Sequence, residues 1–239
     1  LLNTIEARIK KIKSLKKEFS QDSKGIQAFI QEAELINKLS SLTSDRKLYT
    51  YSQGEFIFRD GDFANFIYFV EKGSVKTYKH NDHHKELILE IYNKGDFFGY
   101  QAVLEDREYS VFAASLEDTE IYKIPKEDFL KLLYGNPAVA SRFIKMISRN
   151  LSDKEEQLVK LAYDSVKKRV AGQLVKLCES NPENTIHLSR GDFANLIATS
   201  KETLVRVLSS LKEDGIIDSD GTNIIILEIS KLIELQKWS

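Results

Sequence analysis

The feature that most constrains this chain is a long amphipathic stretch from Pro137 to about Ser165. Apolar residues recur there at alternating spacings of four and three, at positions 140, 144, 147, 151, 158 and 161. That spacing is typical of a coiled-coil seam, and Pro137 suits a helix start because its missing N–H needs no partner there. The seam predicts a parallel homodimer through residues 137–164, with Lys154 as a polar interruption. The alternative is a long amphipathic helix packed on its own domain.

Composition sets the class of protein. The chain has 239 residues, 42% hydrophobic and 30% charged, which is ordinary for a soluble globular protein of one large or two small domains. We expect a cytoplasmic protein, because no apolar run is long enough to cross a membrane and no secretory signal is visible. The single cysteine, Cys178, excludes an intramolecular disulfide and a four-cysteine iron–sulfur cluster. With a net charge of −1, binding to nucleic acid requires a local basic patch.

The opening segment, residues 1–44, carries two helical stripes separated at Gly25. Its sequence LLNTIEARIKKIKSLKKEF resembles the last helix and linker of a bacterial receiver domain. Two interpretations stay open, namely a pair of surface helices or the tail of an upstream receiver domain. The first residue is Leu instead of Met, so the chain is compatible with further residues upstream.

Residues 45–136 change to a period of two. Short segments rich in β-branched and aromatic residues alternate with turn signals that contain glycine, such as Asp60-Gly61-Asp62 and Lys94-Gly95-Asp96. Many short strands at regular spacing predict a barrel or jelly roll, followed by a short helix after Pro125.

The last part, residues 165–239, predicts a winged helix-turn-helix. A helix is followed by a loop and a short strand, and then a second helix starts at Ser189 as N-cap. The tight turn Ala198-Thr199-Ser200 leads into a third helix that is closed by Gly215, and a hairpin and a final helix follow. The predicted fold class is therefore α+β: N-terminal helices, a double-stranded β-roll, a long dimerisation helix and a winged helix-turn-helix.

Two segments carry a family resemblance. FRDGDFANFIYFVEKGSVKTYK and NKGDFFGYQAVLEDREYSVFAA resemble the cyclic-nucleotide-binding β-roll of the CRP/FNR family of bacterial transcription regulators. The resemblance runs from about Asp45 to Glu234, in the family's order of roll, long helix and helix-turn-helix. It implies a homodimer that binds double-stranded DNA at a pseudo-palindromic site, with RNA polymerase as a further partner.

The helix that follows the tight turn is the predicted DNA reader, since the N-terminal residues of the second helix in a helix-turn-helix motif face base edges. The family pattern there is Arg-Glu-Thr, two residues, then Arg, and this chain has Lys201-Glu202-Thr203-Leu204-Val205-Arg206. Glu202 and Arg206 match the pattern, whereas Lys201 keeps the charge without the guanidinium fork. Predicted DNA contacts at the base edges are Lys201, Glu202, Thr203 and Arg206. Candidates for phosphate contacts, which position the protein without reading sequence, are Ser200, Thr203, Arg190, Lys167 and Lys168. Thr199 and Glu202 also fit a capping box, a purely structural alternative.

The family's cyclic-nucleotide site is altered in this chain. The resemblance places Tyr100 at the family's ribose-binding glutamate, Tyr109 and Ser110 at its phosphate-binding Arg-Ser/Thr pair, and Lys154 at an adenine contact. Arg107 lies two residues before the arginine position. We therefore do not expect cyclic AMP binding, and we identify no cofactor and no effector. The candidate pocket residues are Phe98, Gly99, Tyr100, Gln101, Tyr109, Ser110 and Lys154.

Other motifs are weak. His80, His83 and His84 lie at a hairpin turn, where an exposed polar turn explains them better than a metal or haem site. Asp60-Gly61-Asp62 lacks the alternating ligands of a calcium loop. We find no catalytic motif and predict no metal site and no enzyme activity. The alternative function is a ligand-sensing or protein-interaction module whose winged helix contacts protein instead of DNA.

Overall fold

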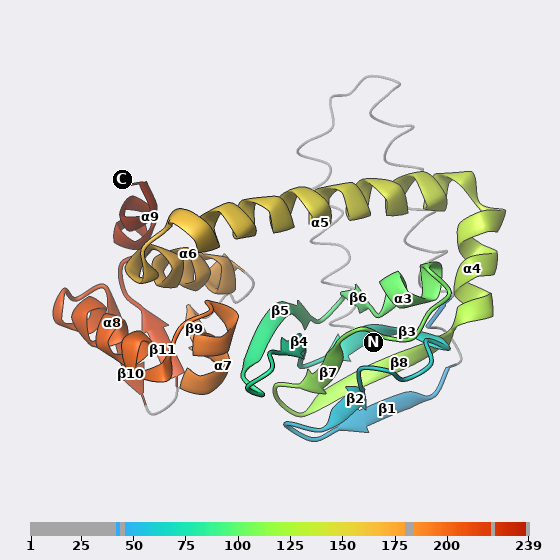
Figure 1. The fold of residues 1–239 in the computed structure, drawn as a ribbon, viewed down its shortest axis with the longest axis horizontal. Coiled ribbons are helices and arrows are strands. Elements are labelled where there is room, and N and C mark those ends of the chain that lie inside the picture. Colours follow the sequence, from blue (N-terminus) through green and yellow to red (C-terminus); the bar gives the residue numbers. More distant parts are fainter. Residues whose placement is uncertain (1–41, 44–45, 180–183, 221–222, 238–239) are drawn as a thin grey trace, which may run out of the picture.

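The structure is a computed structural model that describes residues 42–43, 46–179, 184–220 and 223–237. The predicted N-terminal helical segment, residues 1–44, lies outside the described residues except for Leu42 and Thr43. Within the described parts, a β-rich half and a helical half are joined by one long helix (Figure 1). This arrangement confirms the predicted α+β fold class.

The β-rich half is a roll of two four-stranded antiparallel sheets. One has the strand order β1-β8-β3-β6 and the other β2-β7-β4-β5. Completely buried side chains fill the space between them, including Ile67, Val75 and Ile121. The strands are β1 (Leu48–Tyr51), β2 (Phe56–Phe58), β3 (Phe66–Lys72), β4 (Ser74–His80), β5 (Glu86–Asn93), β6 (Phe97–Phe98), β7 (Phe112–Ser115) and β8 (Thr119–Pro125).

One turn of the roll depends on glycine. Gly73 joins β3 to β4 with a φ of 80°, a conformation that residues with a side chain rarely adopt. A Cβ atom there would lie 2.6 Å from the Thr119 hydroxyl oxygen and 2.7 Å from the Asp118 carbonyl oxygen. The predicted turn therefore needs glycine both for its backbone conformation and for the close approach of the neighbouring loop.

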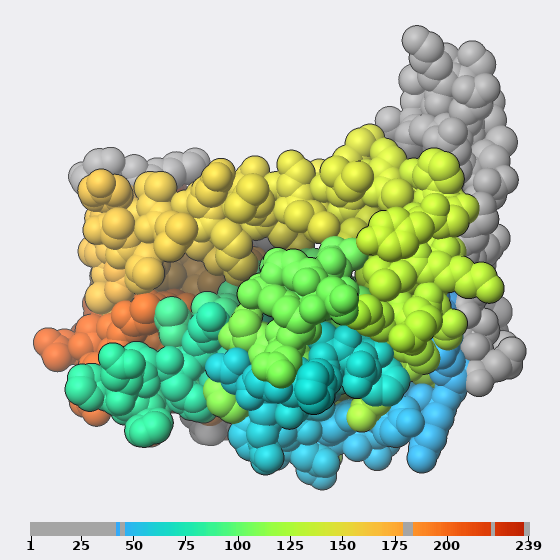
Figure 2. Space-filling model, turned by 45° about the vertical axis from the view of Figure 1, so that its right-hand side comes forward, coloured from blue at the N-terminus to red at the C-terminus, as the bar shows by residue number. Residues whose placement is uncertain are grey.

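Three helices accompany the roll: one lies within its sequence, and two follow its last strand. They are α3 (Tyr100–Leu104), α4 (Lys126–Gly135) and α5 (Pro137–Tyr163). The Asn136 side chain caps α5 by accepting hydrogen bonds from the N–H groups of Ala138 and Val139, at 3.1 and 3.3 Å. With 27 residues α5 is about 40 Å long, and it runs from the roll to the C-terminal half (Figure 1). Figure 2 shows it as a ridge along one edge of the molecule.

The long helix α5 has two apolar faces. On the inner face Val139 is buried and Phe143 packs against the roll core. On the outer face Ile144, Leu151 and Leu158 are 65%, 61% and 66% exposed. The interpretation of α5 as a helix packed only on its own domain accounts for the first face and leaves the second one uncovered in a single chain.

Lys154, the predicted polar interruption of the seam, directs its side chain away from the outer stripe. The Lys154 ammonium turns toward the roll, where it donates to the Leu89 carbonyl at 2.6 Å and contacts the Glu90 carboxylate at 2.5 Å. Position 154 borders the face that lies on the roll, and a long side chain from there reaches two oxygen acceptors of β5. Within the predicted seam Ala140 is half-buried against the roll, whereas Ile147 is exposed.

The C-terminal half is a winged helix-turn-helix. Its core is formed by buried side chains from every layer, including Leu174, Phe193, Leu204 and Ile224. Its three-stranded sheet has the order β10-β11-β9. The elements are α6 (Val166–Glu179), β9 (Thr185–His187), α7 (Arg190–Leu196), α8 (Lys201–Glu213), β10 (Ile217–Asp220), β11 (Asn223–Ile226) and α9 (Ile229–Lys237).

Candidate functional site

The helix-turn-helix is built from two capped helices and a strained turn. Ser189 caps α7 by accepting a hydrogen bond from the Asp192 N–H at 3.0 Å, as predicted. Ala198 adopts a φ of 53° in the turn, where a residue other than glycine costs roughly 1 kcal/mol. Ser200 caps α8 by accepting from the Thr203 N–H at 3.1 Å. The turn geometry therefore fixes α8 relative to α7.

The capping box proposed for Thr199 and Glu202 is wrong in its cap residue. The cap of α8 is Ser200, one residue later, because its hydroxyl is the group that meets the free N–H of Thr203. The Glu202 carboxylate still belongs to the helix start. Hydrogen bonds from its own backbone N–H and from the Ser200 hydroxyl lower the pKa of Glu202, which keeps this exposed group ionised.

The outer face of α8 is polar and open to solvent. Leu204 and Leu211 fix the helix to the core from its inner side. Lys201, Glu202 and Arg206 are exposed on the other side. Positions 202 and 206 are one helical turn apart and share a face. Among the described residues, none forms an ion pair or hydrogen bond with the Arg206 guanidinium, so its five N–H donors face solvent.

The predicted phosphate contacts lie on three different helices. Ser200 begins α8, and Arg190 begins α7, where burial lowers the pKa of its guanidinium. Lys167 and Lys168 lie on α6, away from the turn. Lys167 pairs with the Asp214 carboxylate at 3.3 Å, and Lys168 lies 3.8 Å from that of Asp164. The structure thus groups the predicted α8 residues, whereas these two lysines already have acidic partners.

The interior of the β-roll is filled with aromatic rings. Tyr109 stacks on Phe58 with 3.9 Å between ring centroids and donates a hydrogen bond from its hydroxyl to the Phe66 carbonyl. Phe98 stacks on Tyr68 with 5.0 Å between centroids. All four rings of these two stacks are buried. The tyrosine aligned with the family's arginine therefore occupies the interior, and burial raises its pKa so that it stays neutral.

The predicted pocket residues do not line a single cavity. Phe98 and Tyr109 lie in the filled interior, whereas Gln101 is exposed and Ser110 is half-buried. Tyr100 instead faces α5, where its hydroxyl accepts a hydrogen bond from the Asn150 amide at 2.9 Å. Gly99 precedes α3 with a φ of 79°. Lys154 is held by β5, as described above.

An open hollow of about 550 Å³ lies between the loop at residues 60–65 and the loop at residues 106–110, and two of the predicted pocket residues, Tyr109 and Ser110, line it. Arg107 lines this hollow and pairs with Glu105. Lys126 lines it as well and pairs with Asp106. The arginine that the sequence places two residues early thus lines the hollow, where it pairs with the Glu105 carboxylate. Sequence reasoning named Tyr109 and Ser110 as pocket residues but missed the loop at residues 60–65, which lies far from them in the chain.

The histidine turn shows ring packing. The His80 ring packs against those of Tyr78 and Phe112, and its Nε2 lies 3.9 Å from the Glu86 carboxylate. In the described part of the chain, no three His, Cys, Asp or Glu side chains are placed to share a metal ion. The described helices include none that is both long and apolar enough to span a bilayer.

Comparison with known proteins matches both halves of this geometry. Residues 48–136 match the family model of the cyclic nucleotide-binding domain, and residues 168–235 that of the Crp-like helix-turn-helix domain. The cyclic AMP receptor protein of Thermus thermophilus is 30% identical over 185 residues, which cover 77% of this chain and 86% of that protein.

Solved structures show the same fold. FixK2 from Bradyrhizobium japonicum aligns with a TM-score of 0.75 at 22% identity, over 81% of this chain and 98% of that one. The c-di-GMP-responsive global regulator CLP of Xanthomonas campestris aligns with a TM-score of 0.65 at 26% identity, over the same shares. With both domains matched and a relative 30% identical over most of its length, this chain belongs to the CRP/FNR family of bacterial transcription regulators.

Proposed function

We propose that this transcription regulator acts as a homodimer that places α8 of each chain in successive major grooves of a pseudo-palindromic DNA site. The observation that carries the proposal is the exposed face of α8, with Glu202 and Arg206 one turn apart at its N-terminal end. An arginine can hold guanine O6 and N7 with two hydrogen bonds, and a glutamate can accept from cytosine N4. Lys201 adds a point charge near the phosphates.

The dimer is proposed to form through α5. Its outer stripe exposes Ile144, Leu151 and Leu158, and burying each of these side chains contributes about 1.5–3 kcal/mol. Two such stripes side by side bury their apolar surfaces against each other, as in a coiled coil. The symmetry of this pairing carries over to the DNA site, with half-sites roughly 34 Å apart.

We further propose that the β-roll does not bind cyclic AMP; we identify no cofactor, and its effector is unknown. The interior is occupied by the stacked rings of Phe58, Tyr68, Phe98 and Tyr109, and Arg107, two residues before the expected arginine position, lines the hollow instead and pairs with Glu105. The relatives do not decide the effector, since one is named for cyclic AMP and another is described as responsive to c-di-GMP. RNA polymerase, and an upstream receiver domain, remain proposed partners.

A cytoplasmic location and the lack of enzyme activity are part of the same proposal. They are supported by the membership in a family of transcription regulators. The same family does not favour the alternative in which the winged helix contacts protein instead of DNA.

The test of this function is the selection of bound duplexes from a random pool. We expect an enriched sequence with two inverted half-sites about 10 base pairs apart, centre to centre. If no sequence were enriched after several rounds of selection, sequence-specific DNA binding would be contradicted. Titration calorimetry with cyclic AMP and cyclic GMP tests the roll separately, and micromolar binding of either nucleotide would show that its interior can open.

A further inference from the structure

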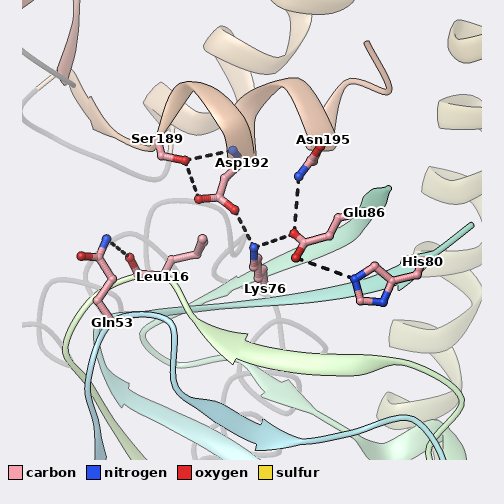
Figure 3. A network of polar contacts seen from close by, with 8 residues as sticks. All are labelled: Gln53, Lys76, His80, Glu86, Leu116, Ser189, Asp192 and Asn195. Carbon is pink, nitrogen blue, oxygen red and sulfur yellow. Dashed lines mark hydrogen bonds and ion pairs between the residues drawn. The ribbon is translucent and has the colours of Figure 1, made fainter. Parts of the chain in front are cut away.

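The first helix of the helix-turn-helix is tied to the β-roll by a network of polar contacts. Figure 3 shows Lys76 of β4 pointing toward α7, between Asp192 and Glu86. Its ammonium lies 2.6 Å from the Asp192 carboxylate and 2.9 Å from that of Glu86. Asn195, one turn further along α7, donates to Glu86 at 3.4 Å. The two α7 residues lie more than a hundred positions after their partners on β4 and β5 in the chain.

This network is shielded from water. The Lys76 side chain is 12% exposed, Asp192 22% and Glu86 28%. Burial alone would lower the pKa of Lys76, but hydrogen bonds and charges of Asp192 and Glu86 outweigh it and raise that pKa. Beside the polar groups, Leu196 of α7 packs against a small buried cluster of the roll formed by Tyr78, Ile88 and Ala114. The contact is therefore a small interface with an ionic centre and an apolar margin.

The contact lies next to the predicted DNA reader. Lys85, at the tip of the β4–β5 hairpin, is near enough to the start of α8 to act electrostatically on Glu202. The pKa of Glu202 is lowered mainly by the hydrogen bonds that its carboxylate accepts at the helix start, and the positive charge of Lys85 lowers it further. In a helix-turn-helix complex the second helix enters the major groove and the first crosses the phosphate backbone. A duplex that lies along α7 and α8 therefore approaches the part of the molecule where α7 is held against the hairpin.

We propose that Lys76, Glu86 and Asp192 form an autoinhibitory latch that holds α7 on the β4–β5 hairpin and keeps DNA from the start of α8. The proposal rests on the proposed DNA reading by α8. It makes the latch the element that an effector, a partner domain or DNA itself must open, because such a ligand shifts the equilibrium only if it favours the open arrangement.

The latch can be opened by removing its central charge. In Lys76→Met the carboxylates of Glu86 and Asp192 face each other without a cation between them, and like charges at close range repel. We expect the variant to bind the selected duplex more tightly than wild type by about 5- to 150-fold, the usual range of coupling between two sites. Fluorescence anisotropy on the full chain measures this change.

Two matched variants separate the latch from a general charge effect. Lys79→Met removes the same charge from an exposed position of the same strand, and we expect wild-type affinity. Lys76→Arg keeps a cation between the carboxylates, and we expect it to remain close to wild type. If Lys79→Met tightened DNA binding as much as Lys76→Met, the latch would be refuted in favour of net charge.

A distance measurement without DNA makes the test independent of the DNA proposal. Spin labels at positions 82 and 209, in a Cys178→Ser background, report the separation of the hairpin tip and α8. We expect a longer and broader distance distribution in Lys76→Met and an unchanged one in Lys79→Met. An unchanged distribution in Lys76→Met overturns the latch, and a longer one with equal or weaker DNA binding overturns its inhibitory role. If no variant binds any duplex, the proposed function fails while the distances still report on the contact.

Discussion

The interior of the β-roll and the outer face of α8 depart from the family pattern in opposite ways. In the roll, Tyr109 stands where the resemblance expects an arginine, and it packs among other buried rings. On α8, Glu202 and Arg206 match the family's residues and stay exposed. The residue aligned with the family's arginine is thus part of the core packing, whereas the residues predicted to read DNA lie on the surface. The four predictions below test this contrast from the larger effect to the smaller.

The strongest effect is expected inside the roll. Phe98→Ala removes a completely buried ring that stacks on Tyr68 and Tyr92, and such a cavity costs about 3–5 kcal/mol of unfolding free energy. Urea unfolding followed by circular dichroism measures the loss. The matched control Phe63→Ala truncates a ring that is 75% exposed and should change stability by less than about 0.5 kcal/mol. A loss below about 1 kcal/mol for Phe98→Ala would indicate an interior with room for a ligand.

Substitutions on the exposed face of α8 should change the free energy of DNA binding and leave the free energy of unfolding nearly unchanged. Arg206→Ala is expected to cost about 1–3 kcal/mol of binding free energy per half-site and to relax the preference at one base position. Mobility-shift titration on the selected duplex and on single-base variants measures both effects. Lys168→Ala, at a predicted phosphate contact, should weaken binding to all sequences alike. If Arg206→Ala still bound DNA tightly and with the same sequence preference, the proposal that α8 reads base pairs through Arg206 would be wrong.

Titration at alkaline pH tests whether the interior of the β-roll is closed to solvent. Burial raises the pKa of Tyr68, Tyr92 and Tyr109 above the ordinary value near 10. Below pH 10 both folded and unfolded chains hold these protons, so stability is unaffected. As the pH rises past 10 only the unfolded chain ionises, and each such tyrosine removes about 1.4 kcal/mol per pH unit. We expect tyrosinate absorbance to appear together with unfolding, and its gradual appearance in the folded protein would contradict a closed interior.

The smallest effect is expected where the roll meets α5. Tyr100→Phe deletes the hydroxyl that accepts from Asn150 and should cost about 0.5–1.5 kcal/mol of unfolding free energy. Tyr134→Phe is the control, since Tyr134 lies 74% exposed on α4. Equal stabilities in urea would mean that the hydrogen bond between α3 and α5 contributes nothing to the contact between roll and long helix.

Regular patterns in the sequence predicted the elements well. The period of two in residues 45–136 corresponds to observed strands, and the N-cap at Ser189 and the helix start at Pro137 are both found in the structure. These features are local, so spacing and turn chemistry are enough to reveal them. The charge lost at position 109 was visible as well, although whether its tyrosine lines or fills the roll depends on side chains from other strands.

Long-range contacts explain what the sequence could not show. The direction of Lys154 depends on oxygen acceptors of β5, which are more than sixty residues away in the chain. Asp192 was recognised only as part of a helix start, because its partner Lys76 lies 116 positions earlier. The hollow beside Arg107 likewise needs two separate loops. None of these pairings leaves a periodic trace in the sequence.

The central claim is that two chains, joined along α5, present two copies of α8 to one duplex. Sedimentation analysis of the complex with the selected duplex tests it most directly, because it counts the chains on each DNA molecule. The account predicts two chains per duplex, with the dimer already present before DNA is added. A single chain bound to a full site, or a monomer that stays monomeric on DNA, would contradict it.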